Sequence, residues 1–191
     1  ARWLSPSRGL ILPGNFIPLF EKSELIVKLD RYMFEHACRW YRSHLEQGGR
    51  PVRLAVNVSK AGLFQNDFVD YYTDIKAKYS IPDRVMELEF TESILAADTE
   101  LFAELVVNLN ARGFICSLDD FGSGYSSLNL LKNLPIDVLK LDILFFQKSR
   151  DIRRERIVVS NVINMAKELD IKTIAEGVED MDTVEFLRKA G

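Results

Sequence analysis

The segment Phe114-Ile-Cys-Ser-Leu-Asp-Asp-Phe-Gly-Ser-Gly124 decides the fold class. Its first half, residues 114–118, is a short and largely apolar run that predicts a buried strand. Two aspartates follow at the carboxyl end of that strand, and a loop rich in glycine and serine comes next. The loop lacks the third glycine of a dinucleotide-binding fingerprint, and the aspartate pair would repel a phosphate. The segment therefore argues against a Rossmann-type open sheet.

Similar apolar runs occur on both sides of this segment, with helical patterns between most of them. The predicted strands cover residues 52–58, 85–90, 114–118, 137–141 and 172–175. After an irregular start, the predicted helices cover residues 19–46, 67–79, 98–112, 127–132, 152–169 and 183–190. Strands that are apolar along nearly their whole length and alternate with helices indicate a parallel sheet covered by helices.

One polar residue lies at or near the carboxyl end of each predicted strand. In chain order these residues are Asn57, Glu89, Asp119, Lys140 and Glu176. Active sites of (β/α)₈ barrels are assembled at that end of the sheet, from several different strands. Packing alone does not explain five such residues in succession. The pattern therefore favours a TIM-like barrel over an open sheet.

The acids and the amide among these residues offer only oxygen ligands. Together with Asp120, they suit hard cations such as Mg²⁺ or Mn²⁺ and do not suit zinc. Adjacent aspartates repel each other unless a cation or a proton separates their charges. For Asp119 and Asp120 alone, a solvated turn is an equally good interpretation. In combination with Asn57 and Glu89, the metal interpretation is favoured.

Lys140 lies within an apolar strand, where a lysine normally pairs with acids or takes part in chemistry. An edge strand with an outward lysine is the alternative, and Asp142 two residues later disfavours it. Glu176 and Glu179 flank a glycine, and either could orient water or bind a metal. We expect Glu179 to be an outer-sphere acid or one at a helix start.

Composition excludes several classes of function. The 191 residues hold 25 lysines and arginines against 28 acids, so the net charge of −3 offers no basic field for a DNA or RNA polymer. Two histidines are too few for most histidine-based chemistry. The two cysteines lack metal-ligand spacing, which agrees with reduced thiols in a cytoplasmic protein. No run is apolar and long enough to span a membrane, although the parent protein could be membrane-anchored.

Several long motifs, in order and in register along nearly the whole chain, resemble the EAL-domain family of cyclic di-GMP phosphodiesterases. They are Gly14-Asn-Phe-Ile-Pro18 with Glu21, Val56-Asn-Val-Ser59, Leu88-Glu-Phe-Thr-Glu-Ser93, Asp119-Asp-Phe-Gly-Ser-Gly-Tyr-Ser-Ser127, Leu134-Pro-Ile-Asp-Val-Leu-Lys-Leu-Asp142 and Ala175-Glu-Gly-Val-Glu179. The resemblance implies a barrel that hydrolyses cyclic di-GMP to linear pGpG with two Mg²⁺ or Mn²⁺ ions.

The resemblance also implies roles for individual residues. Asn57, Glu89 and Asp119 would hold one ion, and Asp119 would bridge to a second ion that Asp120 and Glu176 complete. Lys140 would contact the attacking water, and Glu176 is also a candidate general base. Arg2 would contact the substrate, and Asp142 and Glu179 would support the site from outside. The family's loop that couples the site to a homodimer would comprise Glu92, Asp120, Phe121, Gly122, Ser123, Gly124, Tyr125, Ser126 and Ser127.

The chain departs from the family pattern at both ends. The Glu-Ala-Leu motif is missing, and residues 1–3 align just after it, so we expect the first strand and its metal-binding glutamate upstream. The chain also stops before the expected last strand. We therefore expect residues 1–191 to be a single EAL-type domain, a (β/α)₈ barrel without its first and last strands, whose activity as a fragment would be impaired. The apolar run 143–146 could support a dimer, with core packing as the alternative.

Three functions remain in competition at this point. The first is an active phosphodiesterase, which the competent residues at every covered catalytic position favour. The second is a catalytically inactive cyclic di-GMP receptor, and the third is a protein-interaction module that has lost the nucleotide. Intact acids and an intact loop at 119–127 disfavour the third. Sensor or cyclase domains would accompany the chain in its parent protein.

Overall fold

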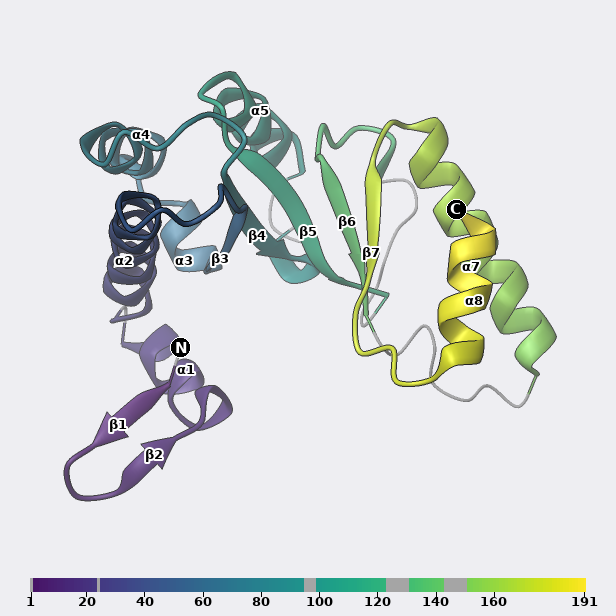
Figure 1. Ribbon diagram of the computed structural model, residues 1–191, viewed down its shortest axis with the longest axis horizontal. Coiled ribbons are helices and arrows are strands. Elements are labelled where there is room, and N and C mark those ends of the chain that lie inside the picture. The colour runs from purple at the N-terminus through teal and green to yellow at the C-terminus, as the bar shows by residue number, and fades with distance from the viewer. Residues whose placement is uncertain (1, 24, 95–98, 123–130, 143–150) are drawn as a thin grey trace. The chain divides into compact units, whose positions relative to one another are not determined.

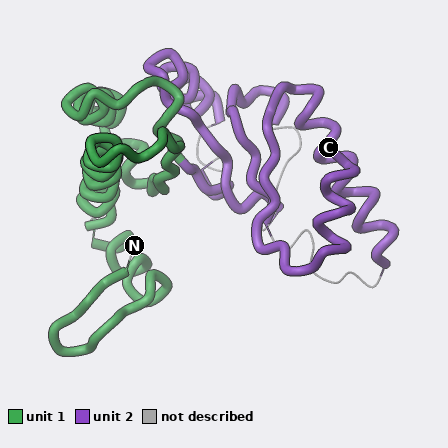
Figure 2. Tube along the Cα trace, viewed as in Figure 1, with its two compact units in different colours: residues 1–88 green, residues 89–191 purple. Residues whose placement is uncertain are grey.

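The computed structural model describes residues 2–23, 25–94, 99–122, 131–142 and 151–191. Two compact units divide the chain, residues 1–88 and residues 89–191 (Figure 2). Five strands form one sheet in the order β3-β4-β5-β6-β7, and this order follows the sequence (Figure 1). Sequential strand order with helices in between is the pattern of consecutive βα units.

Unit 1 begins with an antiparallel hairpin of β1 (Trp3–Ser5) and β2 (Gly9–Ile11). The helices α1 (Pro13–Lys22) and α2 (Leu25–Glu46) follow. Next come β3 (Leu54–Val58), the short helix α3 (Lys60–Leu63) and α4 (Phe68–Lys78). The core of the unit lies between α2 and α4, where the Tyr72 ring centroid is 4.4 Å from that of Phe34 and 4.5 Å from that of Phe68. Helix α2 thereby packs on both α4 and β3.

Strand β4 (Met86–Thr91) leads into unit 2, which continues with a single 3₁₀ turn at Glu92–Ile94 and with α5 (Thr99–Ala111). Strands β5 (Ile115–Phe121), β6 (Val138–Leu141) and β7 (Lys172–Ala175) pair in parallel. Helices α7 (Ile152–Glu168) and α8 (Met181–Ala190) pack against each other, and α7 lies along β7 (Figure 1). Strand residues such as Leu88, Leu118 and Leu139 are fully buried.

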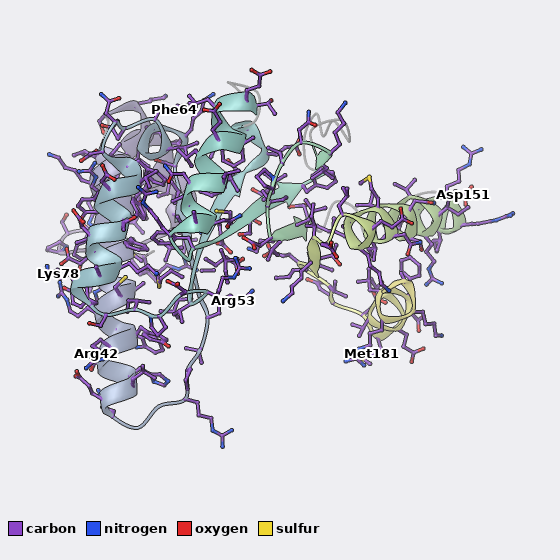
Figure 3. All side chains as sticks on the ribbon, turned by 90° about the horizontal axis from the view of Figure 1, so that it is seen from above. Arg42, Arg53, Phe64, Lys78, Asp151 and Met181 are labelled. Atoms are coloured by element: carbon purple, nitrogen blue, oxygen red, sulfur yellow. The ribbon has the colours of Figure 1, made fainter. Side chains whose placement is uncertain are left out.

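Side chains cap two of the helices in unit 2. Asp151 accepts hydrogen bonds from the backbone N–H groups of Arg153 and Arg154 at the start of α7 (Figure 3). Asp180 accepts one from the backbone N–H of Thr183 at the start of α8. Such caps satisfy N–H groups that a helix leaves without an internal partner. Of the helices in the described part of the chain, none has both the length and the apolar composition needed to cross a bilayer.

The structure confirms the predicted strand–helix alternation and corrects its boundaries. The predicted irregular start is wrong, because residues 3–11 form the hairpin. The predicted continuous helix over 19–46 is also wrong, because α1 begins at Pro13 and ends at Lys22 before α2 starts. Strand β5 extends three residues beyond the predicted end at Leu118, so both aspartates lie within it. Most of the predicted helix 127–132 and the run 143–146 lie outside the described residues.

Candidate active site

The carboxyl ends of four successive strands in unit 2 bring charged residues together. Glu89 comes from β4, Asp119 from β5 and Lys140 from β6, while Glu176 directly follows β7. In register, Lys140 of β6 lies opposite Ile174 of β7, and the backbone N–H of Glu176 donates to the carbonyl of Leu141 at 3.0 Å. The parallel ladder thus sets the height of each side chain at the end of the sheet.

Lys140 is the centre of this cluster. Its Nζ lies 2.7 Å from Oε1 of Glu89, 2.6 Å from Oε1 of Glu176 and 3.4 Å from Oδ1 of Asp119. The Lys140 side chain is only 11% exposed. A lysine ammonium has three donors and no acceptor, so the three carboxylates match its hydrogen-bonding capacity.

The surroundings of Lys140 keep it charged. Burial of the ammonium works against the charged form, but the hydrogen bonds that it donates to Glu176 and Glu89 outweigh this effect, and the pKa of Lys140 is raised. Favourable interaction with carboxylates is the expected cause of such a rise. A lysine with a raised pKa does not serve as a base at neutral pH. Lys140 is instead a fixed cation and a hydrogen-bond donor.

A bulge in β5 explains how two adjacent aspartates reach the same region. Leu118 and Phe121 are three residues apart on β5, but they pair with Leu139 and Leu141, which are two apart on β6. The extra residue on β5 disrupts the alternation of side chains between the two faces of the sheet. Asp120 has the left-handed φ of +56°, and its backbone N–H donates to Oδ1 of Asp119 at 3.0 Å. Non-glycine residues in this conformation are uncommon and concentrate at functional sites.

The electrostatics of Asp120 reflect this crowding. Burial raises the pKa of Asp120, and the negative charges of Asp119, Asp142 and Glu176 raise it further. Asp142, predicted as a supporting acid, thus belongs to the same electrostatic neighbourhood, and its backbone N–H donates to the carbonyl of Phe121 at 3.3 Å. Acids that repel one another at one end of a sheet favour a bound cation.

Part of the predicted coupling loop is described. The backbone N–H of Gly122 donates to Oε2 of Glu92 at 3.3 Å, which ties the start of the loop to the 3₁₀ turn after β4. Gly122 has a φ of +98°, which glycine adopts without strain. Phe121 is buried. The remaining predicted loop residues, Ser123, Gly124, Tyr125, Ser126 and Ser127, lie outside the described residues.

Three further predicted site residues lie in other segments of the chain. Asn57 is an exposed residue of β3, and Arg2 is exposed just before β1; both belong to unit 1 and are described within that unit alone. Glu179 is exposed directly before Asp180. The acid that caps α8 is Asp180, which is not among the residues predicted from the sequence. The sequence signal for this cap was an aspartate three residues before Thr183, at the start of an amphipathic run.

The donor chemistry of the cluster fits hard divalent cations. The carboxylates of Glu89, Asp119 and Glu176 contact Lys140, and the carboxylate of Asp120 interacts with its charge. All of the donor atoms are oxygens, the type that Mg²⁺ and Mn²⁺ prefer. In the described part of the chain, no three Asp, Glu, His or Cys side chains already have the spacing of ligands around one ion. The ammonium of Lys140 lies among the carboxylates instead.

Comparisons with known proteins identify the family of the chain. The EAL domain family matches residues 1–191. The chain is 36% identical over 190 residues to the bifunctional diguanylate cyclase/cyclic di-GMP phosphodiesterase MucR of Pseudomonas aeruginosa, covering 100% of the chain and 28% of MucR. It is also 36% identical to the cyclic di-GMP phosphodiesterase NbdA of the same species, covering 98% of the chain and 24% of NbdA. The chain thus spans about a quarter of the length of these relatives.

A solved structure gives the same result for the fold. The PaMucR phosphodiesterase in complex with c-di-GMP superposes with a TM-score of 0.89 at 36% identity, covering 100% of this chain and 77% of that one. This likeness confirms the predicted α/β fold class of a TIM-like barrel. On the match over its whole length, the chain belongs to the EAL domain family.

Proposed function

We propose that this chain is the catalytic domain of a metal-dependent phosphodiesterase that hydrolyses cyclic di-GMP to linear pGpG in bacterial signalling. The observation that carries the proposal is the buried Lys140, held by Glu89, Asp119 and Glu176 at the carboxyl ends of successive strands. Membership of the EAL family and the names of the relatives MucR and NbdA support it. We also propose that units 1 and 2 belong to one domain, because the family match spans both.

Two divalent cations, Mg²⁺ or Mn²⁺, complete the proposed site. Asn57, Glu89 and Asp119 would hold one ion, and Asp119, Asp120 and Glu176 would hold the other. When bound, a pair of ions supplies a nucleophile at neutral pH and offsets charge on the phosphoryl and leaving oxygens. The cations also compensate the acidic character of the site toward a dianionic substrate.

The three acids that contact Lys140 differ in solvent exposure, and this difference suggests different roles. The side chains of Glu89 and Asp119 are 8% and 13% exposed, whereas that of Glu176 is 43% exposed. We therefore assign to Glu176 the contact with incoming water, as a general base or as a ligand. Lys140 stays protonated and donates a hydrogen bond to the reacting water or to the phosphoryl oxygen next to it.

The remaining assignments concern the substrate and partners. Arg2 would bind a phosphate of cyclic di-GMP, since a guanidinium matches phosphate geometry. Glu92 and the loop 120–127 would couple the site to a homodimer. Cys38 and Cys116 are both buried and form no disulfide, which supports a reducing, cytoplasmic location. Sensor or cyclase domains are proposed for the parent protein, because the chain covers 28% of the length of MucR.

Turnover by the full-length protein tests the proposal. The protein is incubated with cyclic di-GMP and Mg²⁺ or Mn²⁺, and pGpG is measured by chromatography. We expect pGpG to form only with a divalent ion present. Tight binding of cyclic di-GMP without turnover would contradict the enzymatic function and support a catalytically inactive receptor.

A pair of aspartate variants localises the activity. Asp119→Asn removes a carboxylate of the cluster, and we expect turnover to fall by about 10³-fold or more. The matched control is Asp137→Asn, also half-buried, which lies just before β6 at the opposite end of the sheet and accepts a hydrogen bond from the backbone N–H of Cys116. That variant should keep its turnover. Equal activity of both variants would contradict the assignment.

A further inference from the structure

Helix α2 carries an acid on the face that it buries. The buried residues of this helix are Ile26, Asp30, Phe34, Cys38 and Tyr41. Four of them are apolar or aromatic at helical spacing, and Asp30 interrupts them although it is only 7% exposed. A carboxylate in such a position costs folding free energy unless polar partners satisfy it. The hydrogen-bond partners of Asp30 therefore indicate its role.

The partner of Asp30 is the turn that follows β3. Oδ2 of Asp30 accepts a hydrogen bond from the backbone N–H of Ser59 at 2.9 Å, and the side chain of Ser59 adds another. Ser59 in turn caps α3, because its Oγ accepts from the backbone N–H of Gly62 at 3.0 Å. Burial raises the pKa of Asp30, against the effect of the Ser59 hydrogen bonds. The carboxylate thus holds both the end of a strand and the start of a helix.

Gly62 makes this contact sterically feasible. A Cβ atom at position 62 would lie 2.7 Å from Oδ2 of Asp30 and 3.3 Å from Oγ of Ser59. Real Cβ atoms do not approach an oxygen that closely, so a side chain there would displace Asp30. Glycine in a helix normally weakens it relative to alanine. Here its absence of a side chain lets α3 approach the buried carboxylate of α2.

The turn held by Asp30 begins one residue after β3, and Asn57 lies two residues before Ser59. The backbone N–H of Ser59 donates to Asp30, so the buried carboxylate restrains the backbone two residues after Asn57. We infer that Asp30 is a positioning residue, which holds the β3–α3 turn and thereby orients Asn57 toward a divalent cation. The inference rests on the proposed function, in which Asn57 is a metal ligand. Groups that orient ligands from outside the ligand shell contribute strongly to metal affinity.

Binding of Mn²⁺ to the full-length protein tests this role without relying on turnover. Asp30→Ala removes the acceptor, and we expect the Kd for Mn²⁺, measured by calorimetry or electron paramagnetic resonance, to rise about 10- to 100-fold. Asp30→Asn keeps a carbonyl oxygen that can accept from Ser59, so its affinity should stay close to that of the unaltered protein. Rescue by the conservative variant is a result that general loss of stability does not give.

Glu35→Ala is the matched control on the same helix. Glu35 accepts hydrogen bonds from Nζ of Lys78 at 2.7 Å and from the hydroxyl of Tyr79 at 2.9 Å, at the carboxyl end of α4. We expect this variant to lose stability with no change in Mn²⁺ affinity. Gly62→Ala provides a second test if Asp30→Ala does not fold, because its Cβ displaces the carboxylate and should also weaken Mn²⁺ binding.

The outcomes separate the two proposals. Unchanged Mn²⁺ affinity in Asp30→Ala or, if that variant does not fold, in Gly62→Ala overturns the positioning role, even if the protein hydrolyses cyclic di-GMP. Unchanged affinity in Asn57→Ala also overturns it, because Asp30 is argued to act through Asn57. If the unaltered protein shows no turnover but its Mn²⁺ affinity still depends on Asp30, the phosphodiesterase function is contradicted and the positioning role of Asp30 stands.

Discussion

Two lysines in this molecule are buried to nearly the same extent but in different surroundings. The side chain of Lys76, on α4 of unit 1, is 9% exposed, and that of Lys140, on β6 of unit 2, is 11% exposed. Lys76 forms an ion pair with Asp83, whose side chain is 74% exposed. Lys140 contacts three acids, and the side chains of two of these are themselves almost buried.

The difference separates a structural ion pair from the proposed functional cluster. Asp83 lies in the connection between α4 and β4, so its contact with Lys76 fastens that connection to the helix, and solvent can still reach the acid. The acids around Lys140 are held in place by strands and are more numerous than the single lysine. Concentrated and partly buried like charges cost stability, which proteins accept mainly at functional sites.

The largest expected effect is on turnover. Lys140→Met should lower kcat for cyclic di-GMP about 10²- to 10³-fold, because it removes a fixed hydrogen-bond donor from the reacting groups. Lys76→Met, with the same change of side chain at a similarly buried site, should keep its kcat. Both values come from the chromatographic assay of pGpG at saturating substrate and metal. A loss of kcat in Lys76→Met as large as that in Lys140→Met would remove the distinction between the two lysines.

A second effect concerns stability and its dependence on metal. Without divalent ions, Lys140→Met should lose about 3–5 kcal/mol of unfolding free energy, because partly buried carboxylates lose their counter-charge. Lys76→Met should lose less, since Asp83 is free to turn toward water. Added Mg²⁺ should restore part of the loss in Lys140→Met only. Urea unfolding with EDTA and with Mg²⁺ measures all four values, and an equal response of both variants to Mg²⁺ would contradict a metal site next to Lys140.

Much of the fold and of this cluster could be read from the sequence. Apolar runs with a polar residue at the end predicted Glu89, Lys140 and Glu176 at one edge of the sheet, because parallel strands align their carboxyl ends. The conformation of Asp120 could not be read in this way. It depends on the bulge between β5 and β6, which results from the register of two strands and not from either strand alone.

Other features were missed for local reasons. Strands β1 and β2 have three residues each, too few for an alternation pattern to appear. The predicted helix start at residue 19 was wrong because α1 already begins at Pro13, contains Pro18 and ends at Lys22. Asp30 was overlooked because an acid in a helix is usually exposed. Its position four residues after Ile26 and four before Phe34 was the signal that it lies on the buried face.

Two acids, Asp30 and Asp180, show the same contrast between a charge that costs stability and one that adds to it. The expected effect of changing them is the smallest of the three. Burial raises the pKa of Asp30, whereas the backbone and side-chain hydrogen bonds of Thr183 lower the pKa of Asp180. A raised folded-state pKa gives stability that is present below the ordinary value of 3.8 and is lost as the pH rises through the folded-state pKa. A lowered one gives stability that is present above 3.8 and is lost as the pH falls through the folded-state pKa.

Asparagine at each position removes the charge and keeps a similar shape, so the two variants should respond to pH in opposite directions. Relative to the unaltered protein, Asp30→Asn should gain unfolding free energy as the pH rises from about 3 to 7. Asp180→Asn should lose it over the same range, although asparagine still caps α8. Urea unfolding at several pH values gives both differences. If the unfolding free energies of both variants fell with rising pH relative to the unaltered protein, the charged carboxylate of Asp30 would stabilise the fold, as that of Asp180 does. The charge of Asp30 would then carry no cost in stability.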